Sequence, residues 1–120
     1  MQINFDSMMP IYVQIAEAIQ DDIITEILPE GEPAYSQLVI SREFNINPAT
    51  AGKGINLLVQ KGILEKQRGL SMVVAYGARE RLMKEKFEKD FFSSVTVLIA
   101  EAKKIGLSQE KVTAMISERW

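Results

Sequence analysis

The chain has 120 residues, of which 47% are hydrophobic and 25% charged, a composition typical of one globular domain without room for a separate large ligand-binding domain. It contains no Cys and no His, which excludes a disulfide framework, thiolate or imidazole metal ligands and the commonest general base. The net charge of −2 is unevenly distributed: residues 1–35 hold seven acidic residues and no Lys or Arg, whereas residues 36–78 hold five basic and two acidic residues.

The sequence also disfavours an exported or membrane-spanning protein and a metal-binding protein. The N-terminus has no basic segment followed by an apolar run, and no stretch of about 18 consecutive apolar residues occurs, so we expect a cytoplasmic protein that does not cross a membrane. A metal would have to bind carboxylates alone. Because the adjacent Asp21 and Asp22 diverge on a helix and no further ligand accompanies them, we expect no metal and no cofactor.

The first predicted element is an amphipathic helix that follows a short arm. The arm contains Ile3 and Phe5 in alternation, which fits either a strand or a segment packed on the body. From Pro10, apolar residues recur every three to four positions as far as Ile27, which predicts a helix of about 18 residues ended by Pro29. Its outer face is acidic, and we interpret that face as a solvated surface.

Two short helical patterns then meet at a tight hinge. Ser36 is the expected N-cap of a helix that runs to about Phe44. Asn47 followed by Pro48 predicts a new helix, because Asn47 can accept a hydrogen bond from an amide at the helix start, where proline has no N–H to leave unpaired. This helix is expected to run to about Lys61. Two short helices joined in this way predict a helix-turn-helix, whose second helix enters a DNA major groove.

Gly52 and Gly54 lie inside the second of these helices, where each costs about 1 kcal/mol relative to Ala. Close packing against the first helix would compensate, and so would close approach to a DNA backbone or groove wall. The sequence leaves both explanations open.

A β-hairpin is predicted next. Residues 63–67 and 71–75 are strand-like runs, and Gly69 between them is the expected turn residue. A hairpin that follows a helix-turn-helix is a wing, which lies along the minor groove or the phosphates. Arg68 and the backbone amide of Gly69 would be well placed there.

The last third of the chain is predicted to be helical. From about Ala78 to Ile105 one helical pattern runs for about 28 residues, or about 42 Å. Gly106 is the expected stop, and Ser108 the N-cap of a short helix that ends near Trp120. The preceding small domain cannot cover the long apolar stripe, so we expect a second copy of the chain to cover it in a two-fold homodimer, with a small-molecule pocket as the alternative. The expected interface residues are Phe87, Phe91, Val95, Leu98, Ala102 and Ile105.

Motifs spread over nearly the whole chain resemble those of a known family. They are Pro10-Ile11-Tyr12-Val13-Gln14-Ile15, Gly31, Ser36, Ile46-Asn47-Pro48-Ala49-Thr50, Leu58, Lys61-Gly62-Ile63-Leu64 and Arg68-Gly69. With them the chain resembles the GntR family of bacterial transcription regulators. Its tail, with Arg79-Glu80 and residues 102–108, is similar to that of the YtrA subfamily, whose members lack the large effector domain and dimerise through C-terminal helices.

The resemblance implies a mainly α fold with a small β-hairpin: a winged helix-turn-helix DNA-binding domain over residues 1–76 and a helical dimerisation region over residues 77–120. The implied function is that of a dimeric repressor of its own promoter or of a transporter operon, bound to an inverted repeat in double-stranded DNA. The implied DNA contacts are Ser36, Asn47, Ala49, Thr50, Lys53, Arg68 and Gly69.

Three positions depart from the family pattern: Leu38 and Gly52 stand where Arg is common, and Ser71 replaces the second glycine of the wing. The alternative function is a winged-helix protein–protein interaction module without specific DNA binding, which the acidic N-terminal third would suit. An enzyme is the weakest interpretation, because no nucleophile motif accompanies the missing His and Cys. Whether a small-molecule effector exists is left open.

Overall fold

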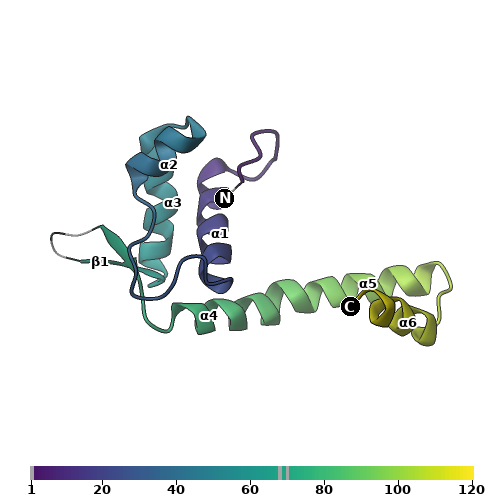
Figure 1. Cartoon of the computed structure of the whole chain (residues 1–120). Helices are drawn as coiled ribbons and strands as arrows, with labels where there is room; N and C mark the ends of the chain where they lie inside the picture. Colours follow the sequence, from purple (N-terminus) through teal and green to yellow (C-terminus); the bar gives the residue numbers. More distant parts are fainter. Residues whose placement is uncertain (1, 68, 70) are drawn as a thin grey trace. The chain divides into compact units, whose positions relative to one another are not determined.

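The structure is a computed structural model that describes residues 2–67, 69 and 71–120, and it groups the chain into two compact units, Met1–Met83 and Lys84–Trp120. The elements are α1 (Ile11–Ile24), α2 (Gln37–Phe44), α3 (Pro48–Gln60), β1 (Leu64–Lys66), β2 (Met72–Val74), α4 (Ala78–Glu85), the π-helical segment η1 (Lys86–Phe91), α5 (Phe92–Lys104) and α6 (Gln109–Arg119) (Figure 1). This mainly helical fold with a two-stranded antiparallel hairpin confirms the predicted fold class.

Helix α1 is shorter than the isoleucine repeat predicted. It ends at Ile24, and Glu26 adopts a left-handed conformation with φ of 64° that stops the helix. The backbone N–H of Leu28 then donates to the Asp22 carbonyl at 3.0 Å, and Leu28 is buried. Ile27 therefore lies outside the helix with 68% of its surface exposed, so its assignment to the helical stripe was wrong.

Helices α2 and α3 begin and end close to the predicted residues. The Ser36 hydroxyl accepts a hydrogen bond from the Val39 N–H at 3.1 Å. The Asn47 side chain accepts one from the Ala49 N–H at 2.8 Å, with Pro48 at the first helical position. Between the helices, Asn45 takes a left-handed conformation. These caps and the left-handed residue confirm the predicted tight turn of the helix-turn-helix.

The wing is an antiparallel hairpin in which Leu64 pairs with Val74 and Lys66 with Met72. Residues 31–34 run along the other edge of β2. The Ala34 N–H donates to the Met72 carbonyl at 2.7 Å, and the Gly31 N–H donates to the Val74 carbonyl at 2.8 Å. The loop before α2 thus adds a third, irregular edge to the hairpin.

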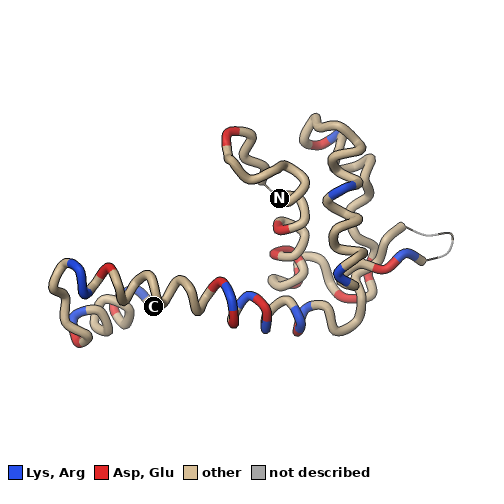
Figure 2. Tube along the Cα trace, turned by 180° about the vertical axis from the view of Figure 1, so that it is seen from behind, with Lys and Arg blue, Asp and Glu red and all other residues tan. Residues whose placement is uncertain are grey.

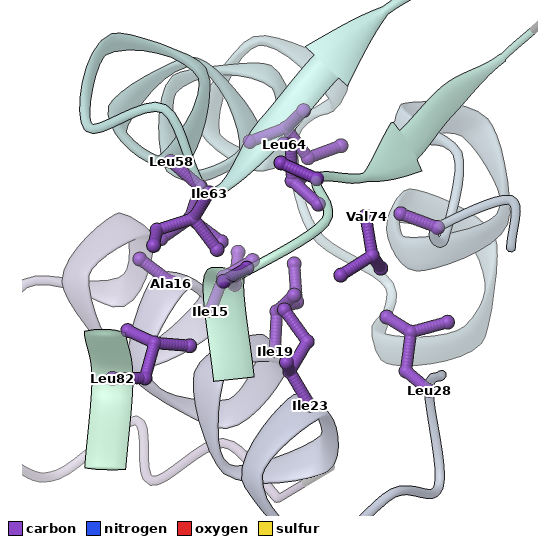
Figure 3. Packing of buried hydrophobic residues seen from close by; sticks show 14 of the residues in the cluster. Ile15, Ala16, Ile19, Ile23, Leu28, Leu58, Ile63, Leu64, Val74 and Leu82 are labelled. Carbon is purple, nitrogen blue, oxygen red and sulfur yellow. The ribbon is translucent and has the colours of Figure 1, made fainter. Parts of the chain in front are cut away.

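The core of the first unit lies where α1, α3, the hairpin and the start of α4 meet (Figure 3). Its largest fully buried side chains are Ile15, Ile19, Ile23, Ile40, Leu58, Ile63, Leu64 and Val74. Leu82 of α4 is also buried in this core. The boundary after residue 76 stays a prediction. The first compact unit extends to Met83 and so includes the start of α4, which helps to fill its core.

Helical residues continue from Ala78 to Lys104, as predicted, but Lys86–Phe91 has π-helical geometry that the apolar pattern did not reveal. Gly106, with φ of 78°, ends α5, and the Ser108 hydroxyl caps α6 by accepting from the Lys111 N–H. Among the described residues, every helix is too short or too polar to traverse a bilayer.

Candidate nucleic-acid interface

The N-terminal half of α3 presents the side chains that the sequence assigned to DNA contact. Asn47, Ala49 and Lys53 are exposed, and Thr50 is half-buried. Ala49 and Lys53 are four positions apart and therefore share one face of the helix. Lys53 is the one charged residue of α3. The predicted residues of this helix are thus brought together at one exposed helix end.

Lys53 has a partner that the sequence did not suggest. Its Nζ atom lies 4.2 Å from the centroid of the Tyr12 ring, which α1 contributes. A cation held against an aromatic face gains about 0.5–1 kcal/mol at an exposed site. Tyr12 belongs to the Pro10–Ile15 motif, but only the packing of α1 on α3 brings its ring to Lys53.

The two glycines of α3 have different surroundings. A Cβ at Gly54 would lie 2.8 Å from the Tyr12 carbonyl oxygen and 2.9 Å from Ile15 Cγ2, so this glycine allows α1 and α3 to approach closely. A Cβ at Gly52 would lie 2.8 Å from Gln37 Oε1. Because the Gln37 amide is the end of a flexible side chain, the packing explanation holds at Gly54 and stays open at Gly52.

An open groove of about 530 Å³ lies on the exposed side of α3. Tyr12 comes from α1 and Gln37 from α2, and the rest come from α3. The residues that line it are Tyr12, Gln37, Ala49, Gly52, Lys53, Asn56, Leu57 and Gln60. Sequence reasoning missed Tyr12, Gln37 and Asn56 as members of this surface.

The remaining predicted contacts come from α2 and the wing. The Ser36 oxygen is used as the acceptor of the α2 cap, which leaves its hydroxyl hydrogen to donate. Gly69 is exposed, with φ of 74°, at the hairpin turn. The predicted contact at Arg68 lies outside the described residues.

Acidic residues gather on α1, which Figure 2 shows as red positions along that helix. Asp22 accepts a hydrogen bond of 2.6 Å from the Tyr35 hydroxyl. Burial, the hydrogen bond to Asp22 and the nearby carboxylates of Asp22 and Glu43 raise the pKa of Tyr35 to about 12. Within the described part of the chain, no three acidic residues converge as a metal site would require.

Known transcription regulators are similar to this chain in sequence and in structure. Over 117 residues, covering 98% of this chain and 89% of the relative, the sequence is 27% identical to the HTH-type transcriptional repressor YtrA of Bacillus subtilis. A GntR family transcriptional regulator from Listeria monocytogenes superimposes with a TM-score of 0.71 at 27% identity, covering 95% of this chain and 98% of that one. In sequence and in fold the chain is similar to YtrA-like transcription regulators of the GntR family.

The same winged fold occurs in a larger protein bound to DNA. S. agalactiae BusR, solved in complex with its busA-promotor DNA, is 24% identical, with a TM-score of 0.55 over 87% of this chain and 52% of that one. No family model matches the sequence. Against the GntR pattern, Leu38 leaves an exposed hydrocarbon where Arg is common, with 52% of its surface accessible.

Proposed function

We propose that this GntR-family regulator is a homodimeric repressor that binds an inverted repeat in double-stranded DNA. The observation that carries the proposal is the exposed face of α3, where Ala49 and Lys53 lie beside the capping residue Asn47. A helix of this kind fits the major groove with its N-terminal residues at the base edges. The proposal includes a cytoplasmic location, where a repressor of its own promoter or of a transporter operon would act.

The residues have distinct proposed roles. Asn47, Ala49 and Thr50 face the bases from the start of α3, while the Lys53 ammonium contacts a phosphate. Ser36 donates its hydroxyl hydrogen to a phosphate, and the exposed Gly69 amide does the same from the wing, beside Arg68. With so few cations, binding is expected to be weak at high salt.

The homodimer is proposed from the second unit, where apolar side chains are exposed along η1 and α5. Phe87, Phe91, Val95, Leu98 and Ile105 are all exposed, whereas Ala102 is 8% exposed and lines a groove of the second unit. The Phe87 and Phe91 rings stack with centroids 6.0 Å apart. Contiguous exposed apolar surface marks a site of association, and a closed two-fold dimer would bury it.

A groove within the second unit is where a small molecule would bind under the alternative interpretation. It encloses about 450 Å³ and is lined by Leu98, Glu101, Ala102, Ile105, Leu107, Val112, Met115, Ile116, Arg119 and Trp120. Exposed apolar side chains also lie outside this groove, at Phe87, Phe91 and Phe92. A second copy of the chain would cover all of it, whereas a small ligand would cover only the groove, and we therefore favour the dimer.

Titration of the protein against labelled upstream DNA fragments and random DNA, at several salt concentrations, tests DNA binding. We expect a salt-sensitive preference for at least one fragment. Replacing Lys53 by Ala should weaken binding to all sequences alike and reduce the salt slope by about one, because one phosphate contact is lost. Lys111→Ala on α6 is the matched control and should leave the slope unchanged.

The alternative, an interaction module without specific DNA binding, makes the opposite prediction. Such a protein would show no preference for any fragment over random DNA, and Lys53→Ala would leave the salt slope as it was. The absence of any preference would overturn the proposed function, and an unchanged salt slope alone would overturn the phosphate contact of Lys53.

A further inference from the structure

We propose that Gln37 reads a base directly and selects an adenine–thymine pair in each half of the DNA site. The inference rests on the proposed function and adds to it a residue that determines sequence preference. Gln37 is the first residue of α2, directly after the cap Ser36, and its side chain is exposed.

The position of the Gln37 amide is set by the absence of a side chain at Gly52. Measured from the point where a Cβ of residue 52 would stand, Oε1 is 2.8 Å away, Cδ 2.9 Å and Nε2 3.2 Å. The whole amide group therefore lies over the middle of the first half of α3, in the space that a side chain at residue 52 would fill. A residue of α2 thus supplies the functional group that α3 lacks at this point.

This placement puts the amide on the DNA-facing surface. Gln37 lines the open groove together with Ala49, Lys53 and Asn56, which lie on the exposed face of α3. Ala49 and Lys53 are the residues assigned above to the bases and to a phosphate. A helix face that enters the major groove would carry the Gln37 amide into the groove with it.

The amide is also chemically available. Among the residues that the structure describes, none donates to or accepts from the Gln37 side chain, whereas the side-chain oxygens of Ser36 and Asn47 each accept a bond from a helix-capping N–H. The neighbouring Leu38 is exposed but offers only carbon. The Gln37 amide therefore keeps both its oxygen acceptor and its N–H donors available for a base.

The chemistry of an amide favours adenine. Its oxygen accepts from adenine N6–H and its nitrogen donates to N7, a bidentate pairing that no other base offers in the major groove. A carboxylate at the same place can only accept and favours the N4 amino group of cytosine. Glutamine and glutamate differ only in the amide nitrogen, which a carboxylate oxygen replaces. Gln37→Glu is therefore expected to change the preferred base from adenine to cytosine.

Selection of bound sequences from a randomised DNA library, followed by titration of single-base variants of the selected site, tests the inference. For the wild-type protein we expect one A·T pair in each half-site that Gln37→Ala no longer distinguishes, with a loss of discrimination there of about tenfold. Gln37→Glu should favour C·G at that same pair. Affinity for random DNA and the salt slope should stay unchanged, because no phosphate contact is lost.

Gly52→Ala provides an independent test of the geometry. The new Cβ would displace the Gln37 amide, whose flexible side chain can move without disturbing the backbone. This variant should lose discrimination at the same base pair as Gln37→Ala, and the double variant should lose no more than either single one. Gln109→Ala is the matched control, because Gln109 is likewise exposed and follows the capping serine of α6.

The outcomes separate the inference from the function on which it rests. If the wild-type protein prefers no sequence, the proposed function fails and the inference fails with it. If the wild-type protein is specific but Gln37→Ala keeps the same preference at every base pair, only the inference is overturned. A uniform loss of affinity for all sequences in that variant would show a phosphate contact and would also overturn it. Thermal melting of each variant verifies that it is folded.

Discussion

At the scale of single residues, the surface of α3 is built by contacts from other helices. Lys53 stands against the Tyr12 ring of α1, and Gly52 lies beneath Gln37 of α2. A lysine side chain has several rotatable bonds, and holding it against a ring lowers the entropy that DNA binding would otherwise have to remove. Residues that never touch DNA can therefore affect its affinity.

Replacing Tyr12 by Leu removes the aromatic face but keeps an apolar side chain of moderate size. We expect the affinity for the selected DNA to fall about two- to fivefold, from a loss of about 0.5–1 kcal/mol of cation–π interaction. Tyr12→Phe keeps the ring and should retain most of the affinity. Anisotropy titration at low salt measures both, and equal losses for the Leu and Phe variants would show that the ring does not act on Lys53.

The residues that the sequence identified correctly are those whose role is local. Ser36 and Asn47 were expected as caps, and each accepts the bond from an N–H two or three positions further along the chain. Tyr12 and Gln37 were missed because their partners lie far away in the sequence. Only the packing of three helices brings them to α3.

At the scale of elements, periodicity located the helices and misjudged where α1 ends. The isoleucine repeat continues to Ile27, but the repeat carries no information about the left-handed Glu26 that stops the helix. The pairing of residues 31–34 with β2 was missed for a similar reason. Its hydrogen bonds join segments about 40 residues apart, and Pro33 lies within the paired stretch where a strand would not be expected.

One contact that fastens α1 to the loop before α2 should give a measurable pH dependence. The Tyr35 hydroxyl donates to Asp22, and the pKa of Tyr35 rises from 10.0 to about 12 on folding. A group whose pKa is higher in the folded state stabilises that state below its unfolded pKa, and the stabilisation is lost as the pH rises through the folded pKa. Stability should therefore fall between about pH 10 and pH 12.

Urea unfolding of the wild-type protein and of Tyr35→Phe at pH 9 and at pH 11.5 measures the effect. The Phe variant should be less stable at pH 9 and should lose less stability on going to pH 11.5. Tyr76→Phe is the matched control, because Tyr76 is 85% exposed. A Tyr35→Phe protein that loses as much stability as the wild type over this interval would contradict the prediction.

At the scale of the whole molecule, the chain divides its apolar surface between a closed core and an open helix face. The first unit buries isoleucine side chains of α1 together with apolar side chains of α3 and the hairpin (Figure 3). In the second unit Ala102 is the buried hydrophobic residue of α5 among those described, while the aromatic side chains of η1 are exposed. The sequence indicated this contrast, because a long apolar stripe exceeded what one small domain can cover.

Replacing Phe91 by Glu places a charge in that stripe. We expect the wild-type protein to sediment as a dimer at micromolar concentration and the variant as a monomer, since burying an unpaired carboxylate costs several kcal/mol. Ser93→Glu, two residues further along at the start of α5, is the matched control and should remain dimeric. The Phe91 variant should also bind the inverted repeat much more weakly, because its half-sites would be occupied independently.

A wild-type protein that sediments as a stable monomer would refute the dimer. The groove bordered by Leu98, Met115 and Trp120 would then be open to a small ligand in every molecule.

The irregular edge beside the wing has a consequence for solubility. Sheet edges with unpaired backbone groups recruit strands from other molecules and begin aggregation. Strand β2 is bonded on one side to β1 and on the other to residues 31–34, so it offers no such edge. The outer strand β1 spans only three residues, Leu64–Lys66, and two of them are charged. Short length and charge make β1 a poor template, so the described strands of the wing give little opportunity for β-mediated self-association.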